Sequence, residues 1–99
     1  MDMRGSAKVI VINAKDNVAT ALKSLIAGTE VSADVHGHIE KVRLLSDIPM
    51  GHKFALNDME KGEAVIKYGE PIGESTARIA RGEHVHVHNV VSQSRGGAK

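Results

Sequence analysis

The sequence predicts a small, mainly β domain with one helix near its N-terminus. Three observations indicate this class: the chain has 99 residues, its apolar residues are almost all aliphatic, and glycines interrupt it at short intervals. The chain has no Trp, one Phe and one Tyr, so its core is expected to consist of Val, Ile, Leu, Ala and Met. A chain of this length is expected to form one domain with a modest core.

The N-terminal part is predicted to form one strand followed by the helix. The β-branched run KVIVIN, residues 8–13, is typical of a buried strand. Residues 17–27 have helical spacing, because four apolar residues would share one helix face. These four are Val18, Leu22, Leu25 and Ile26. Asp16 or Asn17 is expected to cap the helix N-terminus, and Gly28 to end the helix in a left-handed conformation.

The rest of the chain is typical of short strands separated by turns. Three strands are predicted from alternating or β-branched residues: EVSADV (30–35), IEKVRLL (39–45) and AVIKYG (64–69). Gly37 is expected to form the turn between the first two, and EPIG, residues 70–73, a turn after the third. Residues 46–56 are expected to be irregular, and EHVHVHNVV, residues 83–91, to be the last strand.

The pattern apolar-x-x-Gly-x-x-Val occurs three times along the chain. Its copies are LIAGTEV (25–31), MEKGEAV (59–65) and IARGEHV (79–85). Each copy predicts a short helical turn that is stopped by glycine and followed by a strand. The spacings are unequal, so we interpret the pattern as one turn type reused within a domain rather than as an array of repeats.

Composition and charge limit the function. Residues 1–7 and 92–99 lack apolar periodicity and are expected to be flexible tails around a domain at 8–91. The net charge of +1 and the scarcity of aromatic residues do not indicate nucleic-acid binding. The absence of cysteine excludes disulfides and thiolate chemistry. No apolar run approaches the roughly 20 residues of a membrane span, so a soluble cytoplasmic protein without a signal peptide is expected.

The segment HVHVH, residues 84–88, is a candidate metal site. On a strand, its three histidines would share one face, and Val85 and Val87 the other. The outer two histidines would lie about 13 Å apart. Zinc-type ions need ring nitrogens at about 2.0–2.1 Å, so at most two neighbouring histidines are expected to bind one ion. The alternative is an ordinary strand with valines inward and histidines outward.

Other polar residues have both a functional and an ordinary interpretation. The segment HGH, residues 36–38, is expected to turn at its glycine and so to separate its two imidazoles. His52 can act as a general acid or base, and Lys53 and Lys67 can bind carboxylates. The alternative is that these are solvated surface groups. No nucleophile elbow, Walker loop, zinc-finger spacing or helical H-E-x-x-H is present.

Four segments, in the same order and with compatible spacing, carry a family resemblance. INAKDNVATAL, IPMGHKFAL, GEAVIKYGEPIG and GEHVHVHN resemble the N-terminal domain of altronate and galactarate dehydratases. The domain also occurs as a separate small subunit in some dehydratases and in sulfolactate sulfo-lyase. The resemblance covers residues 9–90 and implies an SAF-type β-clip, in which short strands fold over themselves with helical turns between them.

The resemblance implies a lyase system. Its members remove water from altronate or galactarate, or sulfite from sulfolactate, and the dehydratases use Fe²⁺ or another divalent metal. The chain is therefore expected to be a small accessory subunit, inactive alone, that forms one wall of a site completed by a large catalytic subunit. The metal is expected to be held mainly by that large subunit, and the expected substrate is a sugar acid. Alternatives are a sulfolactate sulfo-lyase small subunit, or a carbohydrate-acid or metal-binding module without catalysis.

The resemblance also implies roles for individual residues. The candidates for catalysis are His52, His86 and His88, and those for substrate binding are Lys53, Lys67, Tyr68 and Asn89. His86 and His88 are the candidate metal ligands. His84 departs from the family pattern and is interpreted as a local addition, and His36 and His38 carry no inherited role. Exposed strand edges allow a homo-oligomer, whereas nucleic acid and membrane are not expected as partners.

Overall fold

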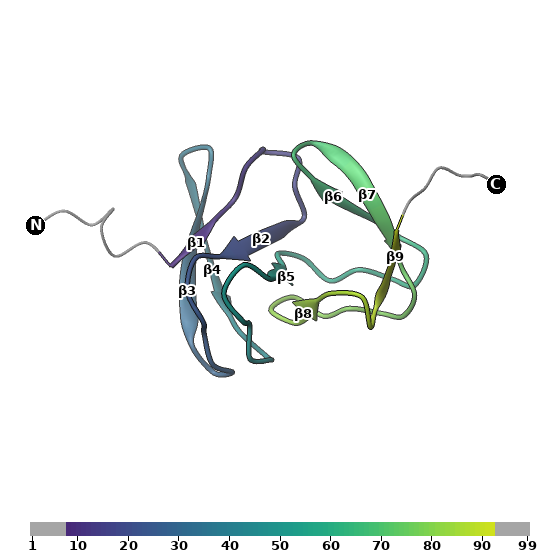
Figure 1. Ribbon diagram of the computed structural model, residues 1–99. Helices are drawn as coiled ribbons and strands as arrows, with labels where there is room; N and C mark the ends of the chain where they lie inside the picture. Colours follow the sequence, from purple (N-terminus) through teal and green to yellow (C-terminus); the bar gives the residue numbers. More distant parts are fainter. Residues whose placement is uncertain (1–7, 93–99) are drawn as a thin grey trace, which may run out of the picture.

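The computed structural model describes residues 8–92, so the expected tails at 1–7 and 92–99 lie outside this range except for Ser92, which is the last residue of a strand. The described residues form nine short strands and no helix, so the mainly β fold class is confirmed (Figure 1). The strands are β1 Val9–Ile10, β2 Val18–Ala21, β3 Glu30–Val35, β4 His38–Arg43, β5 Lys53–Ala55, β6 Ala64–Lys67, β7 Glu70–Ser75, β8 His84–Val85 and β9 Val90–Ser92. Within residues 8–92, no helix is long and apolar enough to cross a membrane.

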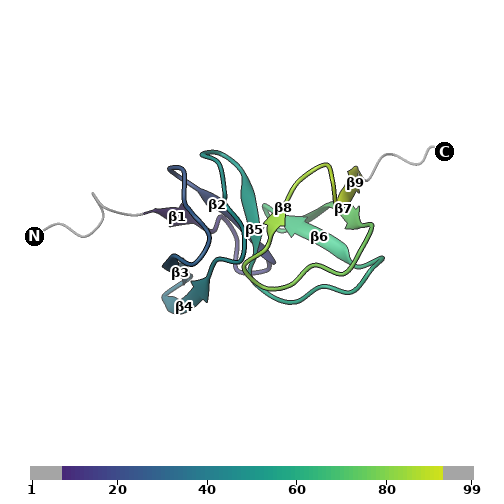
Figure 2. The same cartoon turned by 90° about the horizontal axis from the view of Figure 1, so that it is seen from below.

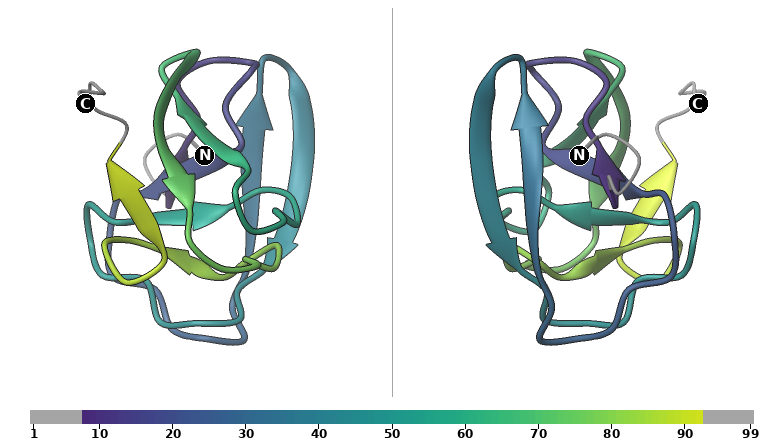
Figure 3. Two further views of the ribbon diagram at one scale, coloured as in Figure 1. Left: turned by 90° about the vertical axis from the view of Figure 1, so that its right-hand side faces the viewer. Right: turned by 90° about the vertical axis from the view of Figure 1, so that its left-hand side faces the viewer.

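The strands form three antiparallel sheets. A central sheet has the order β1-β2-β5-β8, β3 and β4 form a hairpin, and the third sheet has the order β6-β7-β9. The central sheet lies between the other two, as Figure 1 and the view from below in Figure 2 show. The two ends of the molecule are therefore different, with β3 and β4 near one end and β6, β7 and β9 near the other (Figure 3).

The central sheet separates two hydrophobic cores, because its inner strands bury both faces. Ala19 and Phe54 pack into the first core with residues of β3 and β4. Their neighbours Val18 and Ala55 pack into the second core, against the sheet of β6, β7 and β9. All four side chains are at most 1% exposed. Alternate residues of a strand point to opposite faces, so two adjacent short strands are enough to connect two cores.

The helix predicted at residues 17–27 is wrong. Its first residues form β2, which pairs with β1 and β5, and Leu25 then forms an isolated bridge with Ile48. Two of the four residues assigned to the buried helix face, Leu22 and Ile26, are 46% and 70% exposed. The apolar spacing matched a helix by coincidence, and pairing with two distant strands overrides the weak local helix propensity.

Asp16 and Asn17 accept backbone N–H bonds, as predicted, but from a distant hairpin instead of from a helix. Asp16 is buried, and its carboxylate accepts the N–H groups of Asn13 at 3.0 Å and Gly69 at 2.8 Å. Asn17 accepts from the N–H of Ile66 at 2.8 Å and also donates to a backbone carbonyl of β6. These bonds hold the β6–β7 hairpin against the segment that precedes β2.

The recurring glycine pattern forms β-turns instead of the predicted helical turns. The glycines of these turns, Gly28, Gly51, Gly62 and Gly82, have φ between 86° and 90°. In each turn the N–H after the glycine donates to the carbonyl three residues earlier, which with a positive φ at the third position defines a type II turn. The turns meet in pairs through the bridges Leu25–Ile48 and Met59–Ile79. One turn type is thus reused within the domain, as predicted, and IPMG (48–51) is a fourth copy.

The predicted strand boundaries need three further corrections. The run at 8–13 forms only a two-residue edge strand, β1, and Ile10 is 43% exposed. Residues 70–73 belong to β7, because the hairpin turns earlier, at Tyr68 and Gly69, which both have positive φ. The segment 46–56, expected to be irregular, contains the central strand β5. The turn predicted at Gly37 and the strands on either side of it are confirmed.

Candidate functional site

Three histidines meet where β5 and β8 pair. Lys53 of β5 faces Val85 of β8, and Phe54 faces His84. Extending this antiparallel register by one residue places His52 opposite His86. Residues opposite each other in such a pair project from the same side of the sheet. His52, His84 and His86 therefore stand on one face, and Lys53 stands on the other.

The histidine segment is not one continuous strand, which corrects the prediction for residues 83–91. β8 ends at Val85, and a turn follows before β9 begins at Val90. Val87, predicted to point inward, is 82% exposed. Asn89 is buried and shapes this turn: its side chain accepts from the N–H of His86 at 2.9 Å and donates to the carbonyl of His84 at 2.8 Å.

The imidazoles in this cluster are stacked on one another. The ring centroids of His52 and His86 lie 4.2 Å apart, and those of His52 and His84 lie 5.1 Å apart. Nδ1 of His52 and Nε2 of His84 form a 2.8 Å hydrogen bond. One ligand nitrogen from each of His52, His84 and His86 lies within 4.8 Å of the others. We refer to these three residues as the histidine cluster.

Burial and neighbouring charges favour the neutral form of two of these histidines. The pKa of His84 is lowered by desolvation and then by the charges of His88, His52, His86 and Lys53. The pKa of His86 is lowered by desolvation and by the charges of His52, Lys53 and His88. Neutral imidazole is the form that binds metals and accepts protons, so the cluster is prepared for either role near neutral pH.

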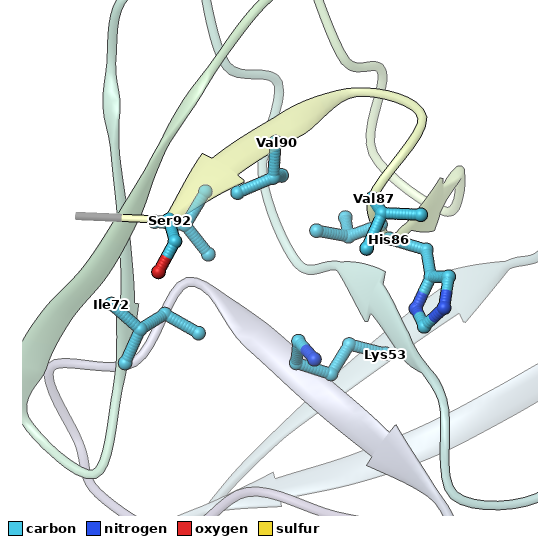
Figure 4. Close-up of a pocket in the computed structure, with 8 residues that line it drawn as sticks. Lys53, Ile72, His86, Val87, Val90 and Ser92 are labelled. Atoms are coloured by element: carbon cyan, nitrogen blue, oxygen red, sulfur yellow. The ribbon is translucent and has the colours of Figure 1, made fainter. Parts of the chain in front are cut away.

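A pocket of about 250 Å³ lies beside the histidine cluster. Its wall is mainly valine and isoleucine, and its polar groups come from Lys53, His86 and Ser92. Figure 4 shows Lys53 and His86 on one side of the pocket and Ser92 on the other. A largely apolar cavity with few polar groups is the usual form of a small-molecule site.

Lys53 gives the pocket a positive character, and Lys67 lies close enough to act on it. The pKa of Lys53 is lowered by desolvation and by the charge of the nearby Lys67. Among residues 8–92, no carboxylate forms an ion pair with either lysine. The ammonium group of Lys67 lies 4.7 Å from the ring centroid of Tyr68, within the range of a cation–π contact. An anionic ligand would relieve the repulsion between the two amines.

The structure brings together most of the residues selected from the sequence. Lys53 lines the pocket, Lys67 is close enough to lower the pKa of Lys53, and Tyr68 contacts Lys67. His36 and His38 lie in the β3–β4 hairpin instead, where His38 contacts Glu40. His88 stacks on His84 at 5.2 Å but is not among the three residues whose nitrogens converge.

Sequence reasoning missed that His84 belongs to this site and that it contacts His52. His84, interpreted as a local addition, is hydrogen-bonded to His52 within the cluster. The two histidines are 32 residues apart, so their contact has no local signal. The glycine turns were the available clue, because IPMG and IARG each precede one of the two paired strands, β5 and β8.

The lowered histidine pKa values predict a loss of stability in acid. The unfolded chain binds more protons than the folded chain as pH falls through the ordinary value of 6.5 toward the lowered values. Urea unfolding in the presence of a chelator should therefore give a smaller free energy of unfolding at pH 5.5 than at pH 7.5. We expect His84→Phe to reduce this difference, because it keeps the stacked ring but removes the titrating group. An equal difference in both proteins would contradict the assignment.

Comparison with known protein families places this geometry in context. A family model described as the altronate/galactarate dehydratase SAF domain matches residues 7–93, which includes every strand and the histidine cluster.

Three curated proteins illustrate the similarity. Altronate dehydratase of Escherichia coli (strain K12) is 56% identical over 80 residues, which are 81% of this chain and 15% of that protein. Galactarate dehydratase (L-threo-forming) of the same organism is 34% identical over 88 residues, or 87% of this chain and 16% of that protein. Subunit alpha of (2R)-sulfolactate sulfo-lyase from Chromohalobacter salexigens is 56% identical over 43 residues, 43% of this chain and 46% of that subunit. The chain thus spans only a small part of the dehydratases that it matches.

Proposed function

Because the chain belongs to the altronate/galactarate dehydratase SAF domain family, we propose that it is an accessory subunit of a sugar-acid hydro-lyase. In this role it forms one wall of a site that a large catalytic subunit completes. The observation that carries the proposal is the pocket of Lys53 and His86, which lies directly beside the histidine cluster. The similarity to subunit alpha of (2R)-sulfolactate sulfo-lyase supports a division of labour between subunits.

The groups in this wall suit part of the chemistry of dehydration. Elimination of water from a hydroxy acid needs a base for the proton beside the carboxylate and a positive group for the carboxylate itself. We assign the carboxylate to Lys53, with Lys67 adding positive charge. His86 lines the same pocket, and its lowered pKa favours the neutral imidazole beside the bound acid. Asn89 supports this arrangement by fixing the backbone of the histidine turn.

A divalent metal such as Fe²⁺ would supply a Lewis acid at the leaving hydroxyl. We propose that the large subunit holds most of the ligands for that ion. The chain described here contributes the pocket, its lysines and a neutral imidazole.

Reconstitution tests the proposal. The purified chain is incubated with altronate or galactarate, first alone and then with a large dehydratase polypeptide from the same organism and Fe²⁺. We expect no loss of substrate with either component alone and dehydration when the two are combined. Turnover by the isolated chain would overturn the accessory role. If the two polypeptides neither bind each other nor show activity together, the proposed partnership is wrong.

A second candidate function is that of a sulfolactate sulfo-lyase small subunit. It is favoured by the 56% identity to a sulfo-lyase subunit alpha, a protein that is itself a separate subunit. Against it, that match covers 43% of this chain, whereas the match to altronate dehydratase covers 81%. The same reconstitution with sulfolactate distinguishes the two, because a sulfo-lyase releases sulfite and a dehydratase does not.

A further inference from the structure

We propose that His52, His84 and His86 form a binding site for one divalent transition-metal ion within this chain. The site is separate from the metal that we assign to the large subunit. It requires neither a partner nor a substrate, so its test does not depend on the proposed lyase function.

The geometry of the cluster supports one shared ion. The three ring nitrogens come from two paired strands and lie within 4.8 Å of one another. Two nitrogens bound at about 2.0–2.1 Å to one ion are separated by at most roughly 4.2 Å, so a small ring movement closes the site. The three residues are only partly buried.

The hydrogen bond between His52 and His84 also supports an ion at this position. Two ring nitrogens only 2.8 Å apart must share a proton between them. A metal ion can replace that proton and be bound by both nitrogens. The stacking of the rings holds them side by side, and the bonds of Asn89 to the backbone of His84 and His86 fix the turn that carries two of the three ligands.

The donor set selects the class of ion. Three imidazoles suit Zn²⁺, Co²⁺, Ni²⁺ or Fe²⁺, whereas Mg²⁺ and Ca²⁺ prefer oxygen ligands. No carboxylate belongs to the group of converging ligands among residues 8–92. Three protein ligands leave one or more positions open for water or another oxygen ligand, as in catalytic metal sites. The pocket lined by Lys53 adjoins the cluster through His86, which belongs to both.

Metal titration of the tag-free, chelator-stripped full chain tests this site. Co²⁺ binding is followed by visible absorption at pH 7.5, and Zn²⁺ binding by calorimetry. We expect one ion per chain and no saturable binding of Mg²⁺. His52→Phe, His84→Phe and His86→Phe keep an aromatic ring for stacking but remove the nitrogens. Each should weaken Co²⁺ binding by at least roughly 10–100-fold, which is the loss seen when a residue that only hydrogen-bonds a metal ligand is removed.

His38→Phe changes an exposed histidine of β4 and is the control for the titration; it should bind Co²⁺ like the unmodified chain. His88→Phe changes the ring that stacks on His84 without converging on the cluster, so it tests whether His88 is a ligand instead. We expect His88→Phe to weaken Co²⁺ binding less than His52→Phe does. The proposal is overturned if the chain binds no Co²⁺ or Zn²⁺, or if binding survives His84→Phe. It is also overturned if binding depends on His88 and not on His52.

A measurement on the unmodified chain tests the site even if the variants do not fold. Co²⁺ is paramagnetic and broadens the ring-proton NMR signals of nearby histidines. At substoichiometric Co²⁺, the signals of His52, His84 and His86 should broaden before those of His36 and His38. Uniform broadening, or earlier broadening at the β3–β4 hairpin, would contradict a site at the cluster.

Discussion

Replacement of Gly82 with alanine is expected to destabilise the domain more than any other single methyl addition at its type II turns. Gly82 is buried, has φ of 90°, and donates its N–H to the carbonyl of Ala55 at 2.8 Å. A Cβ built on this residue would collide with the backbone carbonyl of Arg43. That oxygen belongs to the main chain at the end of β4 and cannot move aside as a flexible side chain could.

The expected loss combines two effects. A non-glycine residue in this conformation costs roughly 1–2 kcal/mol, and overpacking of a closely packed site costs roughly 1–3 kcal/mol more. Urea unfolding should show a loss of about 2–5 kcal/mol for Gly82→Ala, a large part of the stability of a small domain. Because Gly82 is two residues before His84, we also expect the variant to lose Co²⁺ binding.

Gly28→Ala is the matched control for this prediction. Gly28 has the same φ of 90° in the same type of turn, but it is exposed and no atom lies within 4 Å of a Cβ built there. Its substitution should lower the free energy of unfolding only by the cost of positive φ in a non-glycine residue, roughly 1–2 kcal/mol. Equal losses for the two variants would show that the contact with Arg43 does not limit this position.

Lys53→Met is expected to produce the largest loss of activity in the reconstituted enzyme. Methionine keeps an unbranched side chain against the valines of the pocket but removes the ammonium group that we assign to the substrate carboxylate. A hydrogen bond to a charged group contributes about 1.5–3 kcal/mol, which corresponds to a roughly 10–150-fold fall in kcat/KM. Steady-state kinetics should show much of this change in KM, because a carboxylate that does not react is bound in the ground state as well.

The matched control for Lys53 is Lys23→Met, which removes an equal charge from an exposed bend after β2. We expect it to leave kcat/KM unchanged. If both variants lose activity equally, the effect reflects net charge rather than binding in the pocket. If Lys53→Met retains full activity with the large subunit, Lys53 does not bind the carboxylate and the assignment of the pocket is wrong.

The parts of the fold that could be predicted are those set by neighbouring residues. The β3–β4 hairpin was predicted because its alternating residues flank His36 and Gly37, which both adopt positive φ. The reuse of one glycine turn was also visible in the sequence. The predicted helix at 17–27 failed for the opposite reason, since β2 exists only through its pairing with β1 and β5.

The candidate site also combines residues that local motifs predicted with an arrangement that only distant strand pairing decides. The family resemblance predicted Lys53, Lys67, His86 and Asn89 as site residues, but not how they are arranged. Asn89 was expected to bind substrate, and the structure shows its amide bonded to the backbone of the histidine turn. Whether it also contacts a substrate remains a prediction for the assembled enzyme.

The sequence by itself determined the fold class, the family and the glycine turns of the recurring pattern, because positive φ at a glycine is a local requirement that the residue type reveals. Only the tertiary structure decided which strands meet. The pairing of β5 with β8 brings His52 to His84 across 32 residues, and the carboxylate of Asp16 binds Gly69 across 53 residues. Such contacts depend on the packing of two cores on either side of one short sheet, and no local pattern in the chain encodes that packing.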